Sequence, residues 1–166
     1  VVASGAFAAQ PTEAGLVAGR RDSGLSSWLT HHGVEIGASL VMDPQNSAFP
    51  VPVTRQAGGF SFQDLVMLDY PYFVDVRGEG LSDTLPINAG LPQVTVSWAS
   101  PLTVTAGTGV NSTPLLSSSV GSWLSSDTDV MPQIDDQGLS GFEPEGDAGV
   151  HLLGVVLQGK FSSFFA

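Results

Sequence analysis

The chain has 166 residues, enough for one domain with a substantial core. Its 5 basic and 16 acidic residues give a formal net charge of −11, which excludes nucleic acid as a partner and disfavours adsorption to an anionic membrane. The sequence contains no cysteine, so disulfides, thiolate zinc sites and cysteine nucleophiles are excluded. With 42% hydrophobic and 13% charged residues, we expect a folded chain rather than a disordered one.

The first quarter of the chain predicts a helix followed by a strand. Residues 3–9 predict a short strand, followed by irregular chain up to Gly19, and residues 21–32 predict the clearest helix. Leu25, Trp28 and Leu29 lie on one face of that helix, and Gly33 ends it. Residues 34–42 then alternate apolar side chains, which is typical of a strand. This order indicates one half of an α/β layer.

Prolines divide the middle of the chain. Pro44, Pro50 and Pro52 remove backbone donors, so residues 43–52 predict irregular structure. The strongest strand is expected at residues 93–99, where Val94, Val96 and Trp98 share one face. Further extended segments are expected at residues 60–68, 72–77 and 102–105.

The last third predicts two strands around a polar loop. Residues 110–119 predict a strand, and residues 122–126 predict a short turn that carries Trp123. Residues 127–147 hold acidic side chains and no lysine or arginine, which predicts an exposed loop. The acids miss the spacing of a calcium-binding EF-hand, so calcium remains the weaker alternative there. Residues 150–158 are almost continuously apolar, as in a strand buried on both faces of a sheet.

Together these elements predict a single domain over residues 1–166 with a sheet-rich, layered α/β fold. We expect residues 34–42, 93–99 and 150–158 to lie in one sheet. Trp28 and Trp98 are expected to be largely buried, because each lies on the apolar face of its element.

The sequence offers no catalytic residues, metal site or cofactor site. It has no nucleophile elbow, and the adjacent His31 and His32 would point about 100° apart on a helix, too far to hold one metal ion together. Asp43 follows a predicted strand and is either a ligand carboxylate or a turn former. The YPYF block of residues 70–73 either stacks against a ligand or packs against a sheet edge.

Five blocks occur in a distinctive order. They are DPQN at residues 43–46, FPVPV at 49–53, YPYF at 70–73, LPQVTVSWASPL at 91–102 and GKFSSFF at 159–165. In this order they resemble the auxiliary extracytoplasmic component of an uncharacterised class of ABC transport systems, the family of the gliding-motility auxiliary protein GldG. The resemblance covers about residues 23–166.

The resemblance implies a flavodoxin-like or glutamine-amidotransferase-like α/β fold, of which this chain would be the C-terminal part. It also implies a non-enzymatic auxiliary or substrate-contacting periplasmic component, anchored to the inner membrane through a segment outside this chain. Its partners would be the ABC permease and ATPase subunits of the same system. The alternative is a degenerate amidotransferase-like or sugar-binding-like domain that acts as a protein interaction platform. Ligand or partner contact is expected at Asp43, Gln45, Asn46, Tyr70, Tyr72 and Phe73.

Overall fold

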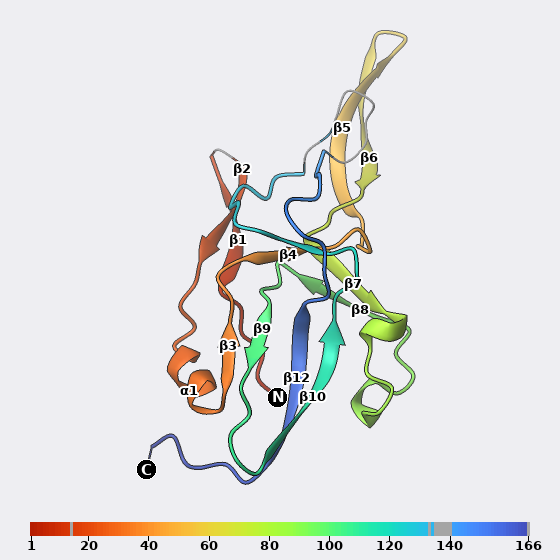
Figure 1. Ribbon diagram of the computed structural model, residues 1–166. Helices are drawn as coiled ribbons and strands as arrows, with labels where there is room; N and C mark the ends of the chain where they lie inside the picture. The colour runs from red at the N-terminus through yellow and green to blue at the C-terminus, as the bar shows by residue number, and fades with distance from the viewer. Residues whose placement is uncertain (14, 133, 135–140, 166) are drawn as a thin grey trace.

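The computed structural model describes residues 1–166 except 14, 133, 135–140 and 166. Within the described residues the regular secondary structure is almost entirely strand (Figure 1). The strands are β1 (Phe7–Thr12), β2 (Gly15–Arg20), β3 (Val34–Ile36), β4 (Leu40–Met42), β5 (Phe49–Ala57), β6 (Phe60–Leu68), β7 (Phe73–Arg77), β8 (Gln93–Ser97), β9 (Leu102–Val104), β10 (Val110–Ser117), β11 (Trp123–Ser125) and β12 (Leu152–Gly159). The helical elements are α1 (Ser26–His31) and the 3₁₀ turns η1 (Gly78–Gly80) and η2 (Pro86–Asn88). The α/β prediction is therefore wrong, and with it the flavodoxin-like or glutamine-amidotransferase-like layering: the fold is mostly β.

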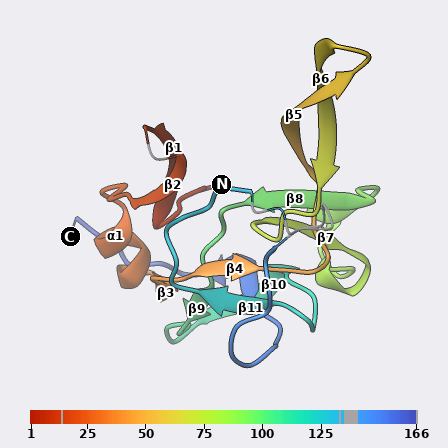
Figure 2. The same ribbon diagram turned by 90° about the horizontal axis from the view of Figure 1, so that it is seen from above.

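The described strands form six two-stranded antiparallel ladders. Figures 1 and 2 show the arrangement of the strands from two directions. The pairs are β1–β2, β3–β9, β4–β11, β5–β6, β7–β8 and β10–β12. The prediction of one sheet for residues 34–42, 93–99 and 150–158 is wrong, because these segments pair with different partners.

A close approach at Gly37 explains why residues 34–42 form two strands instead of one. Its backbone N–H donates to the carbonyl of Pro101 at 2.8 Å. A Cβ atom there would lie only 2.7 Å from Cγ of Pro101, so only glycine fits. The chain bends after this point, and β4 pairs with β11 while β3 stays with β9.

The predicted helix is much shorter than residues 21–32. Asp22 accepts a hydrogen bond from the N–H of Gly24 at 2.8 Å, and Gly24 adopts the left-handed conformation, so residues 22–25 form a turn. The helix α1 begins only at Ser26, and Gly33 follows it with φ 78°, as predicted. Trp28 and Leu29 are half-buried on this short helix.

The irregular structure predicted for residues 43–52 is wrong from Phe49 onward, where β5 begins. β5 and β6, of nine residues each, form a hairpin that projects away from the other strands (Figures 1 and 2). Gly58 and Gly59 are both left-handed, as a two-residue hairpin turn requires. Pro50 and Pro52 fit inside β5 because a strand with one neighbour has alternate N–H groups that form no ladder bond.

The N-terminal part forms a second hairpin, β1–β2. The strand predicted at residues 3–9 begins at Phe7, and β2 was not predicted. Beyond this hairpin, Ala18 donates its N–H to Thr128 at 2.8 Å and Val130 donates to Leu16 at 3.1 Å. The hairpin is thereby attached to the start of the acidic loop.

The core lies where β2, β4, β11 and the segment before β7 meet. Its buried members are Ala18, Leu40, Met42, Tyr70, Tyr72, Trp123 and Val130. A second cluster contains Val41, Val74 and Val76. The prediction of largely buried Trp28 and Trp98 is wrong, because both are half-buried. Trp98 lies just past β8 with φ 50°, so the backbone there no longer continues the alternation of Val94 and Val96.

The remaining strand predictions are confirmed with small shifts of their ends: β6, β7, β8, β9, β10 and β12 fall where extended chain was expected. β12 is half-buried rather than buried on both faces, because its ladder has only two strands. Residues 122–126 contain the strand β11 instead of only a turn. The described residues of the acidic segment 127–147 are mostly exposed, as predicted, and Val130 is the buried exception. Residues 133 and 135–140 of that segment lie outside the described residues.

Candidate functional site

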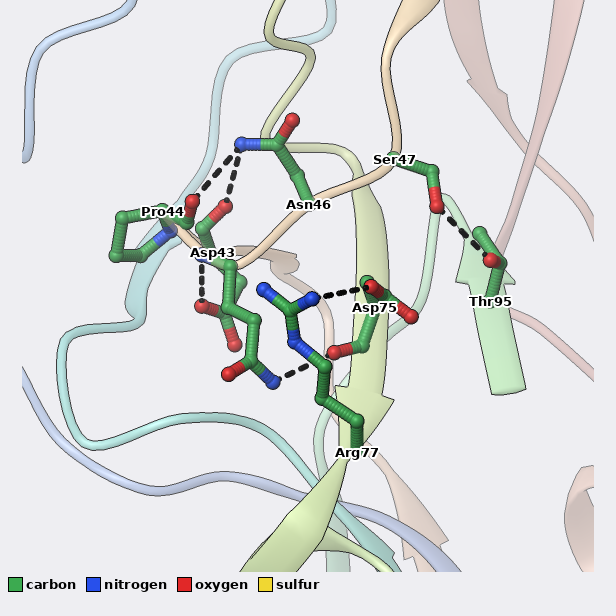
Figure 3. A network of polar contacts seen from close by, with 8 residues as sticks. Asp43, Pro44, Asn46, Ser47, Asp75, Arg77 and Thr95 are labelled. Carbon is green, nitrogen blue, oxygen red and sulfur yellow. Dashed lines mark hydrogen bonds and ion pairs between the residues drawn. The ribbon is translucent and has the colours of Figure 1, made fainter. Parts of the chain in front are cut away.

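The two blocks that contain all the predicted contact residues meet in the structure. Residues 43–47 lie against residues 70–75, with an antiparallel bridge between Asn46 and Val74, and we call these two segments together the central node. Figure 3 shows part of it. Ser47 donates its N–H to Phe73 at 2.9 Å, and Asp75 donates its N–H to Gln45 at 2.9 Å. The fold therefore brings together the six residues singled out from the sequence.

Both side-chain amides of the node bind the backbone of the same node. Gln45 donates from Nε2 to the carbonyl of Asp75 at 2.6 Å. Asn46 donates from Nδ2 to the carbonyls of Asp43 and Pro44, and its Oδ1 accepts the N–H of Tyr70 at 2.8 Å. These amides hold the two segments in register, which leaves little capacity for a ligand.

Asp43 is fully buried, with 0% of its surface exposed. Its Oδ1 accepts the N–H of Gln45 at 2.8 Å and the hydroxyl of Ser119 at 2.6 Å, and its Oδ2 accepts the N–H of Ser119 at 2.7 Å. The hydrogen bond from the N–H of Gln45 is typical of a turn-forming aspartate, whose side chain accepts the backbone N–H two residues further along the chain. Of the two alternatives left open by the sequence, this geometry matches the turn former.

The rings of Tyr70 and Tyr72 are also buried in the core. Tyr70 donates its hydroxyl to the carbonyl of Val130 at 2.6 Å and accepts the indole N–H of Trp98 at 3.2 Å. Burial raises the pKa of Tyr70 to about 12 and raises the pKa of Tyr72 as well. Phe73 packs edge-on against Tyr70 and Trp98. A ligand or partner would reach these tyrosines only if the core opened.

Further polar side chains lie beside the node (Figure 3). Arg77 lies 3.7 Å from Oδ2 of Asp75, and Ser47 and Thr95 share a hydrogen bond of 3.0 Å. Oδ1 of Asp75 is buried and has no hydrogen-bond partner among the described residues. No group of three or more metal-ligating side chains occurs in the part of the chain that the structure describes.

His151 lies near this node and was not predicted as part of it. Its backbone N–H donates to Oγ of Ser118 at 2.7 Å, and Ser118 in turn shares a 2.6 Å hydrogen bond with Ser122. Its Nε2 is buried and has no hydrogen-bond partner among the residues described. Burial lowers the pKa of His151, and the charge of Asp43 opposes that shift.

We expect stability to fall in acid partly through His151. Because its pKa is lower in the folded state than in the unfolded chain, its stabilising effect is present above the unfolded pKa. That effect is lost as pH falls through the folded pKa. Urea unfolding at pH 7.5 and at pH 5 should show a smaller free energy of unfolding at pH 5. His151→Phe should reduce that difference, and an unchanged difference would contradict the assignment.

Two surface hollows lie away from the node. One, of about 460 Å³, lies between the end of α1 and the segment after β12, with His31, His32, Glu35 and Lys160 in its wall. The other, of about 500 Å³, is formed by residues around η1 and by β10. Neither contains any of the six residues at which contact was expected from the sequence.

The main exposed feature of the fold is the β5–β6 hairpin. Phe60 is 79% exposed, Leu65 66% and Met67 61%, and Phe62 is also exposed. Single exposed apolar residues are common on proteins, but several close together on one projecting element are typical of an interaction site. None of the residues at which the sequence predicted contact lies in β6. The signal was present in FSFQDLVML, where apolar residues occupy both faces of the strand.

Comparison with known protein families gives one match, and it covers almost the whole chain. The model of the family described as "ABC-type uncharacterized transport system" matches residues 3–166. The chain belongs to this family. The resemblance to an auxiliary component of an ABC-type transport system is thus confirmed. No curated protein and no solved structure matches the chain.

The central node and the β5–β6 hairpin of this transport-system component differ in how accessible their side chains are. The central node is closed by its own hydrogen bonds, whereas the hairpin leaves apolar side chains in solvent. Among the described helices, none is long and apolar enough to cross a membrane. The hairpin, rather than the central node, therefore presents accessible apolar side chains.

Proposed function

We propose that this chain is a non-enzymatic, extracytoplasmic docking module of its ABC-type transport system. It is anchored to the inner membrane through a segment outside this chain, as its resemblance to the gliding-motility auxiliary family implies. Its partner is the permease and, through the permease, the ATPase. The observation that carries this proposal is the exposed apolar surface of the β5–β6 hairpin.

The geometry of the central node supports a non-enzymatic role. A general acid or base must reach a substrate within hydrogen-bond distance. Asp43 is buried, and its carboxylate already accepts three hydrogen bonds from the protein. The hydroxyl of Tyr70 is likewise buried and hydrogen-bonded on both its donor and its acceptor side. These residues stabilise the part of the fold from which the hairpin projects.

The hairpin has the composition of an interaction surface. Aromatic residues and methionine are enriched at protein interfaces, and charged residues are depleted at their centres. Phe60, Phe62, Leu65 and Met67 fit that composition. The exposed hairpin ion pair between Arg55 and Asp64, at 3.2 Å, joins the two strands across the hairpin. Burying one such apolar side chain at an interface contributes about 1.5–3 kcal/mol.

Co-purification with the permease tests this function. The full-length anchored protein is co-expressed with the permease and ATPase of its own system, solubilised in detergent and captured. The double variant Phe60→Ser/Leu65→Ser is expected to recover at least tenfold less permease than the unsubstituted protein. Val120→Ser is the matched control, because Val120 is equally exposed but lies outside the hairpin. Equal recovery of the permease by all three proteins would refute the docking role of the hairpin.

A further inference from the structure

We infer that the outer edge of β6 accepts an extended strand of the membrane partner, so that docking adds a third strand to the hairpin. This inference rests on the proposed docking function and specifies how the docking occurs. It predicts which of the two hairpin edges is used. Strand addition of this kind obtains affinity from main-chain hydrogen bonds and specificity from the side chains beside the edge.

The prolines of β5 determine which backbone groups point outward. Pro50 pairs with Met67 and Pro52 pairs with Leu65 in an uninterrupted antiparallel register. Since proline has no N–H, neither pair can exchange both ladder hydrogen bonds, so these are non-hydrogen-bonded pairs. Hydrogen-bonded and non-hydrogen-bonded pairs alternate along the hairpin. The pair Thr54–Gln63 is therefore also non-hydrogen-bonded, and both of its N–H groups point away from the ladder.

The two edges of the hairpin differ in the donors that they offer. On β5, Pro50 and Pro52 leave the edge near the base of the hairpin without donors. On β6, the residues whose N–H groups point outward are Ser61, Gln63, Leu65 and Met67. The N–H of Leu65 already donates to Oδ1 of Asp64 at 3.0 Å, as expected for a group outside the ladder. No described residue outside the hairpin forms a backbone hydrogen bond with residues 60–67. The edge of β6 is thus the only one able to pair along its length.

The side chains beside this edge indicate the chemistry of the incoming strand. Leu65 and Met67 are exposed on one face of the hairpin, and Phe60 and Phe62 are exposed on the other. A strand added to β6 would place side chains next to both pairs. The partner segment should therefore be apolar on both faces and neutral or basic in charge, because Asp64 lies beside the edge and the chain carries −11.

Charge disfavours the two other occupants of this edge. A second copy would pair with this edge antiparallel, about a two-fold axis. If the axis passes through residue 64, the two Asp64 side chains lie directly opposite each other. If it passes through residue 63, they lie diagonal to each other. Like charges in such positions destabilise a strand pair. An anionic membrane surface would repel a chain with a net charge of −11. A strand of the membrane subunit avoids both costs.

Two matched proline substitutions test the choice of edge. Gln63→Pro removes an outward donor from β6, and Thr54→Pro removes the paired outward donor from β5. Neither breaks a ladder bond, and the two positions lie directly opposite each other. In the co-purification described above, Gln63→Pro is expected to reduce recovery of the permease at least tenfold. Thr54→Pro should leave recovery within about twofold. Near-ultraviolet circular dichroism of both variants checks that the core is intact.

Hydrogen–deuterium exchange on the full-length complex gives a direct readout of strand addition. The amides of Ser61, Gln63 and Met67 should exchange slowly in the complex with the permease and fast in the free chain, while those of Thr54 and Gln56 should stay fast in both.

If Gln63→Pro retains the permease while Phe60→Ser/Leu65→Ser loses it, strand addition is refuted and side-chain docking stands. If neither variant affects recovery, both proposals fail. Slow exchange in the isolated chain together with dimers in sedimentation would assign the edge to a second copy, and protection by anionic vesicles alone would assign it to the membrane. Either result refutes the inference.

Discussion

Trp123→Ala is expected to lower the free energy of unfolding by about 3–5 kcal/mol. Trp123 is only 2% exposed and lies in the main core cluster with Leu40, Met42 and Tyr72. Removing the indole leaves a cavity that rigid neighbouring strands fill only in part. Urea unfolding followed by circular dichroism measures the loss, which should lower the thermal midpoint by roughly 10 °C.

Two controls separate the cavity from other effects. Trp28→Ala removes the same side chain from a half-buried position on α1, so its cost should be clearly smaller. Trp123→Phe should also cost less than Trp123→Ala, because the indole N–H of Trp123 has no hydrogen-bond partner among the described residues. If Trp28→Ala cost as much as Trp123→Ala, the position of the core would be wrong.

Asp43→Ala is expected to destabilise the protein by at least about 3 kcal/mol. The substitution removes the acceptor of three hydrogen bonds and leaves the N–H of Gln45 and both donors of Ser119 unpaired in a part-buried place. Asp43→Asn should also be destabilising, because one of its two side-chain groups becomes a donor that faces other donors. Chemical unfolding of the two variants measures both effects.

Asp64→Ala is the matched control for the loss of a carboxylate. Asp64 forms an ion pair with Arg55 on the exposed hairpin, where such pairs contribute at most about 1 kcal/mol. A loss of stability in Asp43→Ala no larger than in Asp64→Ala would contradict the structural role of Asp43. It would then favour Asp43 as a ligand-binding carboxylate, the other alternative raised by the sequence.

Local pattern in the sequence predicted most of the extended segments. Alternating or continuous apolar residues located β6, β7, β8, β10 and β12, because a strand places successive side chains on opposite faces whatever it pairs with. Gly33 ended α1 as predicted, since the left-handed conformation there favours glycine. The ordered blocks pointed to the transport-system family, and the family match over residues 3–166 confirms it.

The segments singled out from the sequence meet in the fold, but the burial of their side chains was not evident from the sequence. The blocks around Asp43 and Tyr70 meet in the central node. Their sequences do not indicate, however, that the distant Ser119 donates two of the three hydrogen bonds to Asp43. The same limit applies to His151 and Ser118. Burial and long-range hydrogen bonds decide whether a polar group is available to a ligand.

By itself, the sequence determined most of the segments that extend and the glycine that ends α1, and its charge argues against nucleic acid as a partner. Only the tertiary structure decided which strands pair, that Trp123 rather than Trp98 is buried, and that Pro50 and Pro52 belong to a strand. The physical reason is that a two-residue period is the same for every strand, whereas pairing is set by hydrogen bonds between segments far apart in the chain. A proline that would break a central strand is harmless in β5, because the structure gives that strand a single neighbour.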